Sequence, residues 1–229
     1  VLCYVLAYLD RINIGFAKLQ MQLDTGLTDA SYGLGAGMFF IGYIFFEIPS
    51  SLWLLKIGAR RTISRIMICW GLTSAAMLFV GDPITFYMLR FLLGVFEAGF
   101  APAMLFYLTV WFPEKRMARA LAITTAAPSI AGVIAGPLST GIMTAFDGVH
   151  GLAGWQWMFL LEGLPCVFVG LAVFWWIDDH PSKAGWLSNA EKAAILSQTQ
   201  PRTGHTKSFW QAAADPFIYV LAAGYFCII

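Results

Sequence analysis

Long runs of hydrophobic residues alternate with short polar links along this chain of 229 residues. A helix needs about 20 residues to cross the hydrocarbon core of a membrane. On that criterion the pattern predicts six spans, at residues 1–17, 32–55, 62–80, 84–111, 118–145 and 156–177. A seventh span is predicted to begin near residue 216. The pattern is typical of a multi-pass, all-helical membrane protein.

One polar link is much longer than the others. Residues 178–207 carry the helix breakers Pro181 and Pro201, and the interpretation that we favour for this stretch is a plain linker. Within it, Ser188 and Glu191 have the spacing of a capping box, which would open a short surface helix. We therefore expect a six-helix bundle over 1–177, a linker over 178–207 and the start of a second helical half over 208–229.

The two ends of the chain both fall inside apolar runs, so we interpret the sequence as a piece of a longer protein. Six spans, a long linker and the beginning of a seventh suggest one half of a twofold-repeated transporter. The expected missing partner is a C-terminal half of the same chain.

Basic residues are distributed unevenly between the links. Three links hold eleven of the fourteen, namely Lys56, Arg60, Arg61, Arg65, Lys115, Arg116, Arg119, Lys183, Lys192, Arg202 and Lys207. The links on the opposite side carry Lys18 alone. Because cytoplasmic loops are enriched in Lys and Arg, the three basic links, including 178–207, are predicted to lie in the cytoplasm.

The composition agrees with a membrane protein and argues against other classes. Hydrophobic residues make up 59% of the chain and charged residues 12%, against about 25% charged in an average soluble domain. The four cysteines are scattered singly, and we find no nucleotide-binding loop, metal-ligand set or nucleophile with a base. We therefore expect no enzyme activity, no cofactor and no nucleic-acid partner.

Among the charged residues that interrupt the apolar runs, Asp10, Arg11, Arg90 and Glu97 rank highest as functional candidates, ahead of Glu47 and Glu162. Charges inside a membrane are costly unless they are paired or face water, so they are functional candidates by default. In a helix, Arg11 shares a face with Tyr8, and Arg90 lies on nearly the same side as Glu97. Both pairs can line one cavity. The alternative is that Asp10 and Arg11 neutralise each other to stabilise packing.

The link after the second span, "SLWLLKIGARR", resembles the loop signature of the major facilitator superfamily. The residues that fit are Lys56, Gly58, Arg60 and Arg61, whereas Leu55 stands where the signature has an Asp. In span four, Arg90 and Gly94 resemble the family's Arg-x-x-x-Gly motif. The resemblance implies the major facilitator fold, with a gating role for the four loop residues and for Glu47 just before them.

Three further stretches, "YLDRINIGFA", "FFEIPSSL" and "GLAGWQWMFLLEGLP", look like the anion:cation symporter family, and most like its bacterial tartrate and phthalate permease branch. That family takes up organic anions together with protons or other cations. The resemblance covers essentially the whole chain. It implies a multi-pass protein of the cell membrane, in bacteria the inner membrane.

The residue types match the chemistry of a carboxylate symporter. A guanidinium is always charged and holds a carboxylate through two parallel hydrogen bonds, so Arg11 is the first choice for substrate binding and Arg90 the second. The hydroxyls of Tyr8 and Tyr43 are expected in the same wall. A buried carboxylate is driven towards its neutral form by desolvation and towards its charged form by a nearby cation. Asp10 and Glu97 are therefore the predicted proton carriers.

The sequence thus predicts proton-coupled uptake of a small organic carboxylate by alternating access within a lipid bilayer. Two alternatives remain open. The stretch "GVIAGPLSTG" resembles a motif of proton antiporters, which would make the protein an exporter. A transporter-like sensor or scaffold would keep the spans but would need no charges in a cavity.

The predicted orientation can be tested by cysteine labelling of the full-length protein in a cysteine-free background. A Gly148→Cys variant should react with an impermeant reagent in intact cells, because its link lacks Lys and Arg. A Ser182→Cys variant should react only after permeabilisation. The reverse pattern would overturn the orientation.

Overall fold

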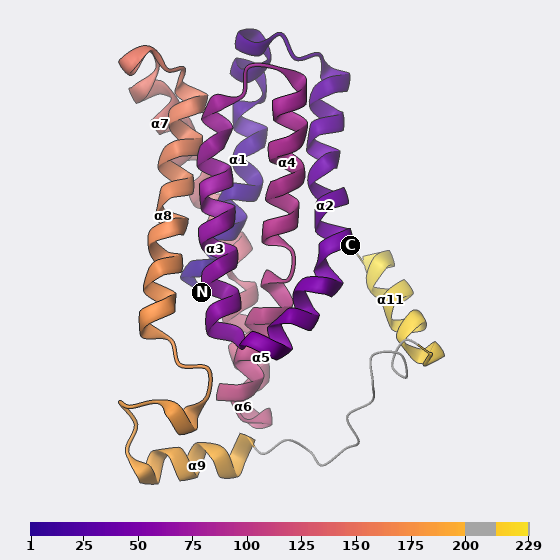
Figure 1. Cartoon of the computed structure of the whole chain (residues 1–229), viewed down its shortest axis with the longest axis vertical. Helices are drawn as coiled ribbons and strands as arrows, with labels where there is room; N and C mark the ends of the chain where they lie inside the picture. Colours follow the sequence, from indigo (N-terminus) through magenta and orange to yellow (C-terminus); the bar gives the residue numbers. More distant parts are fainter. Residues whose placement is uncertain (200–213, 229) are drawn as a thin grey trace. The chain divides into compact units, whose positions relative to one another are not determined.

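The computed structural model describes residues 1–199 and 214–228. The first part contains α1 (Leu2–Thr25), α2 (Asp29–Ile57), α3 (Ala59–Ala76), α4 (Pro83–Glu97), α5 (Phe100–Trp111), α6 (Glu114–Thr125), α7 (Ala127–Phe146), α8 (Gly154–Trp176) and α9 (Asn189–Thr199) (Figure 1). Single 3-10 turns occur at Met77–Phe79, Val149–Gly151 and Pro181–Lys183. The second part forms α11 (Pro216–Ile228).

By length and composition, five helical segments of the described residues are able to cross a membrane. They are Asp29–Ile57, Ala59–Phe79, Pro83–Trp111, Glu114–Phe146 and Gly154–Trp176. Helix α1, with 24 residues, is also long enough, but its apolar run is interrupted by Asp10, Arg11 and Lys18. The predicted all-helical membrane fold is confirmed, and α1 extends eight residues beyond its predicted end.

The helices of residues 1–199 pack in pairs. α3 lies along α8, α2 along α4, and α1 against both α7 and α8. The interior holds large side chains that are fully buried, among them Trp70, Phe86 and Trp155. Many large apolar side chains, such as Leu34, Phe45 and Trp176, are exposed on the outside, as expected for a bundle whose surroundings are lipid.

The α2–α4 contact depends on two glycines. A Cβ at Gly42 would lie 2.3 Å from the carbonyl oxygen of Phe91, and one at Gly94 would lie 2.0 Å from that of Phe39. Backbone meets backbone at this crossing, which only a residue without a side chain permits. The close approach brings the α2 side chains Phe39 and Tyr43 next to α4.

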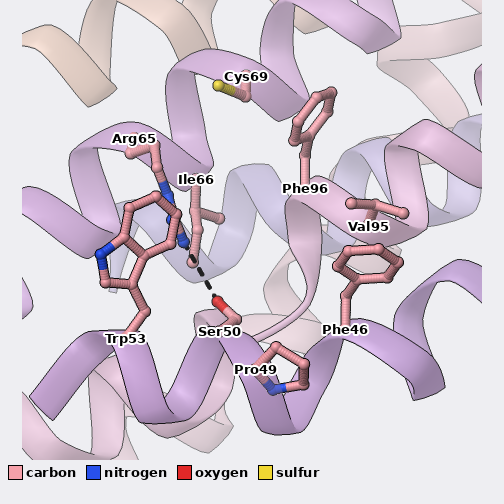
Figure 2. A pocket seen from close by; sticks show the side chains of 9 residues that line it. All are labelled: Phe46, Pro49, Ser50, Trp53, Arg65, Ile66, Cys69, Val95 and Phe96. Atoms are coloured by element: carbon pink, nitrogen blue, oxygen red, sulfur yellow. Dashed lines mark hydrogen bonds between the residues drawn. The ribbon is translucent and has the colours of Figure 1, made fainter.

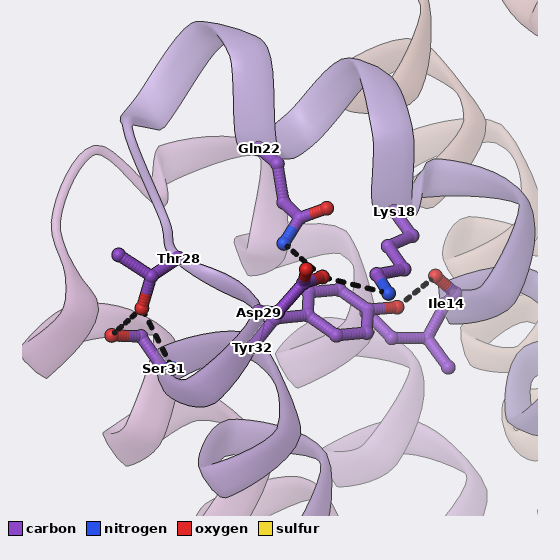
Figure 3. Close-up of polar contacts among 7 residues, drawn as sticks. All are labelled: Ile14, Lys18, Gln22, Thr28, Asp29, Ser31 and Tyr32. Atoms are coloured by element: carbon purple, nitrogen blue, oxygen red, sulfur yellow. Dashed lines mark hydrogen bonds and ion pairs between the residues drawn. The ribbon is translucent and has the colours of Figure 1, made fainter.

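A set of polar contacts clamps the turn between α1 and α2 (Figure 3). Asp29 at the start of α2 pairs with Lys18 Nζ at 3.0 Å and accepts a hydrogen bond from Gln22 Nε2 at 3.2 Å. The Tyr32 hydroxyl donates to the carbonyl oxygen of Ile14. These contacts tie the last turns of α1 to the first turn of α2.

The three predicted basic links meet at one end of the bundle (Figure 1). There, Arg60 Nε donates to the carbonyl oxygen of Phe174 at 2.5 Å, and Trp111 stacks on Trp186 with ring centroids 5.7 Å apart. At the other end Trp155 Nε1 donates to Asp24 Oδ2 at 2.8 Å. The basic residues Arg202 and Lys207 lie outside the described residues.

One local alternative is confirmed by the described residues, and the interpretation that was favoured over it is wrong. Ser188 and Glu191 form the predicted capping box, with Ser188 N donating to Glu191 Oε2 at 2.9 Å and Glu191 N to Ser188 Oγ at 3.3 Å. Asp215 caps α11 by accepting from Phe217 N at 3.1 Å. The favoured interpretation of 178–207 as a plain linker was wrong, because α9 follows the capping box.

The glycine crossing leads to a matched pair of variants in the full-length protein. Gly42→Ala should lower the Tm by about 3 °C or more, because the methyl group forces α2 and α4 apart at a cost of about 1–3 kcal/mol. Gly33→Ala on the same helix has open space around its Cβ and should not lower the Tm, since Ala favours the helix. Equal destabilisation by both variants, measured by thermal unfolding in detergent, would contradict the crossing.

Candidate functional site

Arg11 of α1 and Glu97 of α4 form an ion pair inside the bundle, with Arg11 Nη2 donating to Glu97 Oε1. The Glu97 side chain is 4% exposed and that of Arg11 37%. Two of the predicted site residues, 86 positions apart in the sequence, are thus in direct contact. The always-charged guanidinium provides a partner that stabilises Glu97 in its charged form.

Aromatic rings surround the Arg11 guanidinium. Its central carbon lies 5.5 Å from the ring centroids of Tyr8 and Phe39 and 5.6 Å from that of Tyr43. Arg11 Nε is buried and has no hydrogen-bond partner among the described residues. Cation–π contacts therefore position the Arg11 guanidinium, while at least one of its N–H groups makes no hydrogen bond.

A hollow of about 40 Å³ borders this pair and is lined by Tyr4, Ala7, Tyr8, Arg11, Tyr43, Glu97, Phe100 and Ala101. The predicted wall of Tyr8, Arg11 and Tyr43 is thus present around one space. A hollow of this size exceeds the roughly 10–15 Å³ that is needed to hold one water. The hollow by itself is too small for an organic anion.

Asp10 lies on a different side of α1 from Arg11. It is buried and accepts hydrogen bonds from Trp70 Nε1 at 2.8 Å, Asn13 Nδ2 at 3.3 Å and the Ser74 hydroxyl. In the described part of the chain no ion pair joins Asp10 to Arg11. Asp10 instead links α1 to α3, and the alternative of a self-neutralising neighbour pair is not what the structure shows.

Arg90, the fourth predicted charged residue, lies on α4 near the other three. Its guanidinium carbon lies 5.1 Å from the Phe39 ring centroid, so Phe39 contacts both predicted substrate arginines. Arg90 interacts electrostatically with both Asp10 and Glu97, and its Nε is buried without a hydrogen-bond partner among the described residues. The four predicted charges therefore form one electrostatic cluster, although only Arg11 and Glu97 touch directly.

The predicted span 84–111 is not one continuous helix. α4 ends at Glu97, Ala98 is extended, and Gly99 has a φ of 87°. A Cβ at Gly99 would lie 2.3 Å from Ser50 Oγ on α2, so the break packs tightly. Sequence reasoning missed this interruption, for which Gly99 followed by Pro102 in the first turn of α5 was the available signal.

The predicted gating loop is anchored by a residue that sequence reasoning missed. Asp179, which follows α8, accepts a hydrogen bond from Arg60 N at 2.7 Å in the first turn of α3. Gly58 has a φ of 86°, and a Cβ there would lie 2.7 Å from Asp179 Oδ1. Asp179 thus supplies an acidic partner at the loop, where Leu55 replaces the usual Asp.

The other predicted gating residues are less closely connected. Arg61 lines a hollow of about 510 Å³ together with Arg60, Asp178 and Asp179. No ion pair joins Glu47 to Lys56, Arg60 or Arg61 within residues 1–199. A gating role for these residues stays a prediction.

A larger hollow of about 450 Å³ lies between α2, α3 and α4 (Figure 2). Its charged group is Arg65, which lies 4.2 Å from the ring centroid of Trp53 and donates from Nη2 to Ser50 Oγ at 3.2 Å. None of its lining residues is a carboxylate. The Arg11 hollow is smaller, but it combines a guanidinium with a buried carboxyl, so we place the candidate site there.

The sequence matches the Major Facilitator Superfamily over residues 1–229. The chain belongs to this family of membrane transporters, and it is not an enzyme. It is 53% identical to a Pseudomonas putida protein named as the metabolite transport protein NicT, over 94% of this chain and 49% of that protein. It is 46% identical to an Agrobacterium vitis protein named as a tartrate transporter, over 98% and 53%.

A third relative is named the quinolone resistance transporter of Acinetobacter baumannii, with 47% identity over 86% of this chain and 45% of that protein. The fold is similar to that of a bacterial homologue of the human lysosomal transporter Spinster, crystallised in an inward-facing, occupied conformation. That structure covers 78% of this chain with a TM-score of 0.72 at 23% identity, and 43% of its own chain is matched. The chain spans about half the length of the curated relatives it matches.

The anchoring role of Asp179 can be tested in the full-length protein. Asp179→Ala removes the acceptor at the start of α3 and should cost about 0.5–2 kcal/mol, as the loss of a helix cap does. Asp178→Ala, a neighbour that also lines the hollow, should change stability by less than about 0.5 kcal/mol. Thermal unfolding in detergent measures both, and equal effects would show that Asp179 has no special role.

Proposed function

We propose that this chain forms half of a secondary transporter that takes up an organic carboxylate together with protons by alternating access. The observation that carries the proposal is the Arg11–Glu97 ion pair in a wall with Tyr8 and Tyr43. A group suited to bind carboxylates is here occupied by a carboxyl of the protein itself. Relatives named as tartrate and metabolite transporters support the substrate class.

Competition for one guanidinium would couple the anion to the proton. While Glu97 is charged it holds Arg11, and when Glu97 binds a proton its attraction for Arg11 falls and the fork becomes available. The proton therefore favours anion binding. By linkage, a bound anion raises the proton affinity of the site by the same factor.

The remaining assignments follow the same logic. Arg90 is the second anion-binding group, and Asp10 is the second proton carrier. We place the protein in the bacterial inner membrane with the basic end of the bundle, and the linker beginning at residue 178, in the cytoplasm. Glu47, Lys56, Gly58, Arg60 and Arg61 act at that end as the gate.

Proton-coupled export is the second candidate function. A relative named for quinolone resistance, together with the antiporter-like stretch in α7, favours it. Export uses the same competition in the reverse direction, so the direction of coupled transport separates the two. A scaffold without transport is disfavoured by the unused donors on Arg11 and Arg90, since charges that serve packing alone are expected to be fully paired.

The proposal is tested in proteoliposomes that contain the full-length protein. Arg11→Lys keeps the charge but loses the fork, so the Kd for the anion should rise by about tenfold, or about 1.4 kcal/mol, at every pH. Glu97→Gln mimics the protonated carboxyl, so anion binding and counterflow should persist while accumulation driven by a pH gradient is lost.

Asp10→Asn should behave like Glu97→Gln if Asp10 carries a proton. Gly33→Ala on α2, whose added methyl group meets open space, serves as a control substitution and should transport like the unchanged protein. Undiminished gradient-driven accumulation in both carboxyl variants would refute the coupling. Net efflux of anion against inward proton flow would favour the exporter.

A further inference from the structure

Glu162 is a buried carboxyl on α8 that does not line the Arg11 hollow. Its Oε1 accepts a hydrogen bond from Ser139 Oγ of α7 at 2.7 Å. Its Oε2 is buried and has no hydrogen-bond partner among the described residues. The proposed transport cycle above leaves this carboxyl without a role.

Asn13 of α1 connects Glu162 to Asp10. Its side chain is fully buried, and Nδ2 donates to Asp10 Oδ1 at 3.3 Å. The same amide interacts with the carboxyl of Glu162. Asn13 Oδ1, like Glu162 Oε2, is buried without a partner in the described part of the chain.

The two atoms without a partner, Glu162 Oε2 and Asn13 Oδ1, are both hydrogen-bond acceptors. This determines which protonation state of Glu162 fits. A charged carboxylate offers no donor, so it would leave Glu162 Oε2 and Asn13 Oδ1 both unsatisfied. One proton on Glu162 Oε2 supplies a hydroxyl that can donate to Asn13 Oδ1. Because buried polar groups are nearly always hydrogen-bonded, the neutral form of Glu162 is the one this environment accommodates.

The charge of Asp10 acts in the same direction, whereas the hydrogen bonds from Ser139 and Asn13 favour the charged form of Glu162. α8 packs against α1, α3, α7 and the Met77–Phe79 turn. The ionisable groups near the carboxyl are Asp10 on α1 and the thiol of Cys166, whose Sγ donates to the Glu162 carbonyl oxygen at 3.5 Å. Within the described residues no cation pairs with Glu162. Asp10, by contrast, has three donors, which suits a charged carboxylate.

We propose that Glu162 is a further proton-binding site, and that Glu162 and Asp10 share one proton across the amide of Asn13. The inference deepens the proposed proton-coupled function and rests on it for its role in transport. The conformation described here corresponds to a charged Asp10 and a protonated Glu162. In the opposite state the proton is on Asp10, Glu162 is charged, and the amide is rotated so that it donates to Glu162 and accepts from Asp10.

Two features favour one shared proton: the repulsion between the Asp10 and Glu162 carboxylates, and the hydrogen-bonding properties of the Asn13 amide. Two carboxylates joined through one side chain in an apolar interior disfavour simultaneous ionisation. An amide carries a donor and an acceptor of nearly the same shape, so it satisfies either arrangement after a half turn. Asn13 is thus a positioning residue that makes the two protonation states mutually exclusive.

The test uses infrared difference spectroscopy of the full-length protein, which reports protonated carboxyls without requiring transport. At neutral pH, Glu162→Gln should remove the absorbance of one protonated carboxyl, which Glu97→Gln should leave in place. Asp10→Asn removes the anionic neighbour, so the titration of the Glu162 band should move to lower pH. Persistence of the band in Glu162→Gln, or an unmoved titration in Asp10→Asn, would overturn the proposal.

A second pair of variants leaves the carboxyls intact. Ser139→Ala removes the hydroxyl that donates to Glu162 and should move the loss of the band to higher pH. Ser64→Ala removes a buried hydroxyl that bonds to the Gly170 carbonyl oxygen at 2.7 Å, and it should not move the band. If the band behaves as expected while the protein shows no proton-coupled transport, the shared proton stands and the proposed function fails.

Discussion

The Arg11–Glu97 ion pair joins α1 to α4, with Glu97 buried in the bundle and Arg11 partly withdrawn from solvent. Removing two charges from water costs several kcal/mol per ion unless the geometry and further contacts compensate. The aromatic rings of Phe39 and Tyr43 provide part of that compensation, and they reach the guanidinium because Gly42 allows α2 to approach α4. The helix crossing and the charge cluster are therefore one arrangement, in which a change in either affects the other.

The break after Glu97 places irregular backbone directly beside this arrangement. Ala98 and Gly99 lie outside helical geometry, so α4 and α5 are two separate helices. Gly99 in this interruption packs against Ser50 of α2, and the Ser50 hydroxyl accepts a hydrogen bond from Arg65 of α3. Irregular backbone at membrane depth is tolerated only inside protein or beside a cavity, and this one adjoins the proposed proton carrier.

The sequence predicts the spans well because crossing a membrane imposes a run of about 20 apolar residues that can be counted directly. It also identifies the members of the cluster, since charges in such runs are few. It does not predict their partners. Arg11 pairs with Glu97 rather than with its neighbour Asp10, because consecutive helical residues point about 100° apart. The anchoring by Asp179 depends equally on which helix ends meet, and nothing local to a link indicates this.

Charge balance connects the anion site to Glu162 in the proposed cycle. With Glu162 neutral, Arg11 and Arg90 balance Asp10 and Glu97, so the cluster carries no net charge. A bound monocarboxylate adds one negative charge in a region of low dielectric, and a single proton on Glu97 restores the balance. A dicarboxylate adds two negative charges and therefore needs a second proton from solution. Moving the shared proton from Glu162 to Asp10 cannot supply it, because that transfer leaves the total charge of the cluster and Glu162 unchanged. The number of protons that transport requires is therefore set by the charge of the anion, whichever of Asp10 and Glu162 holds the shared proton.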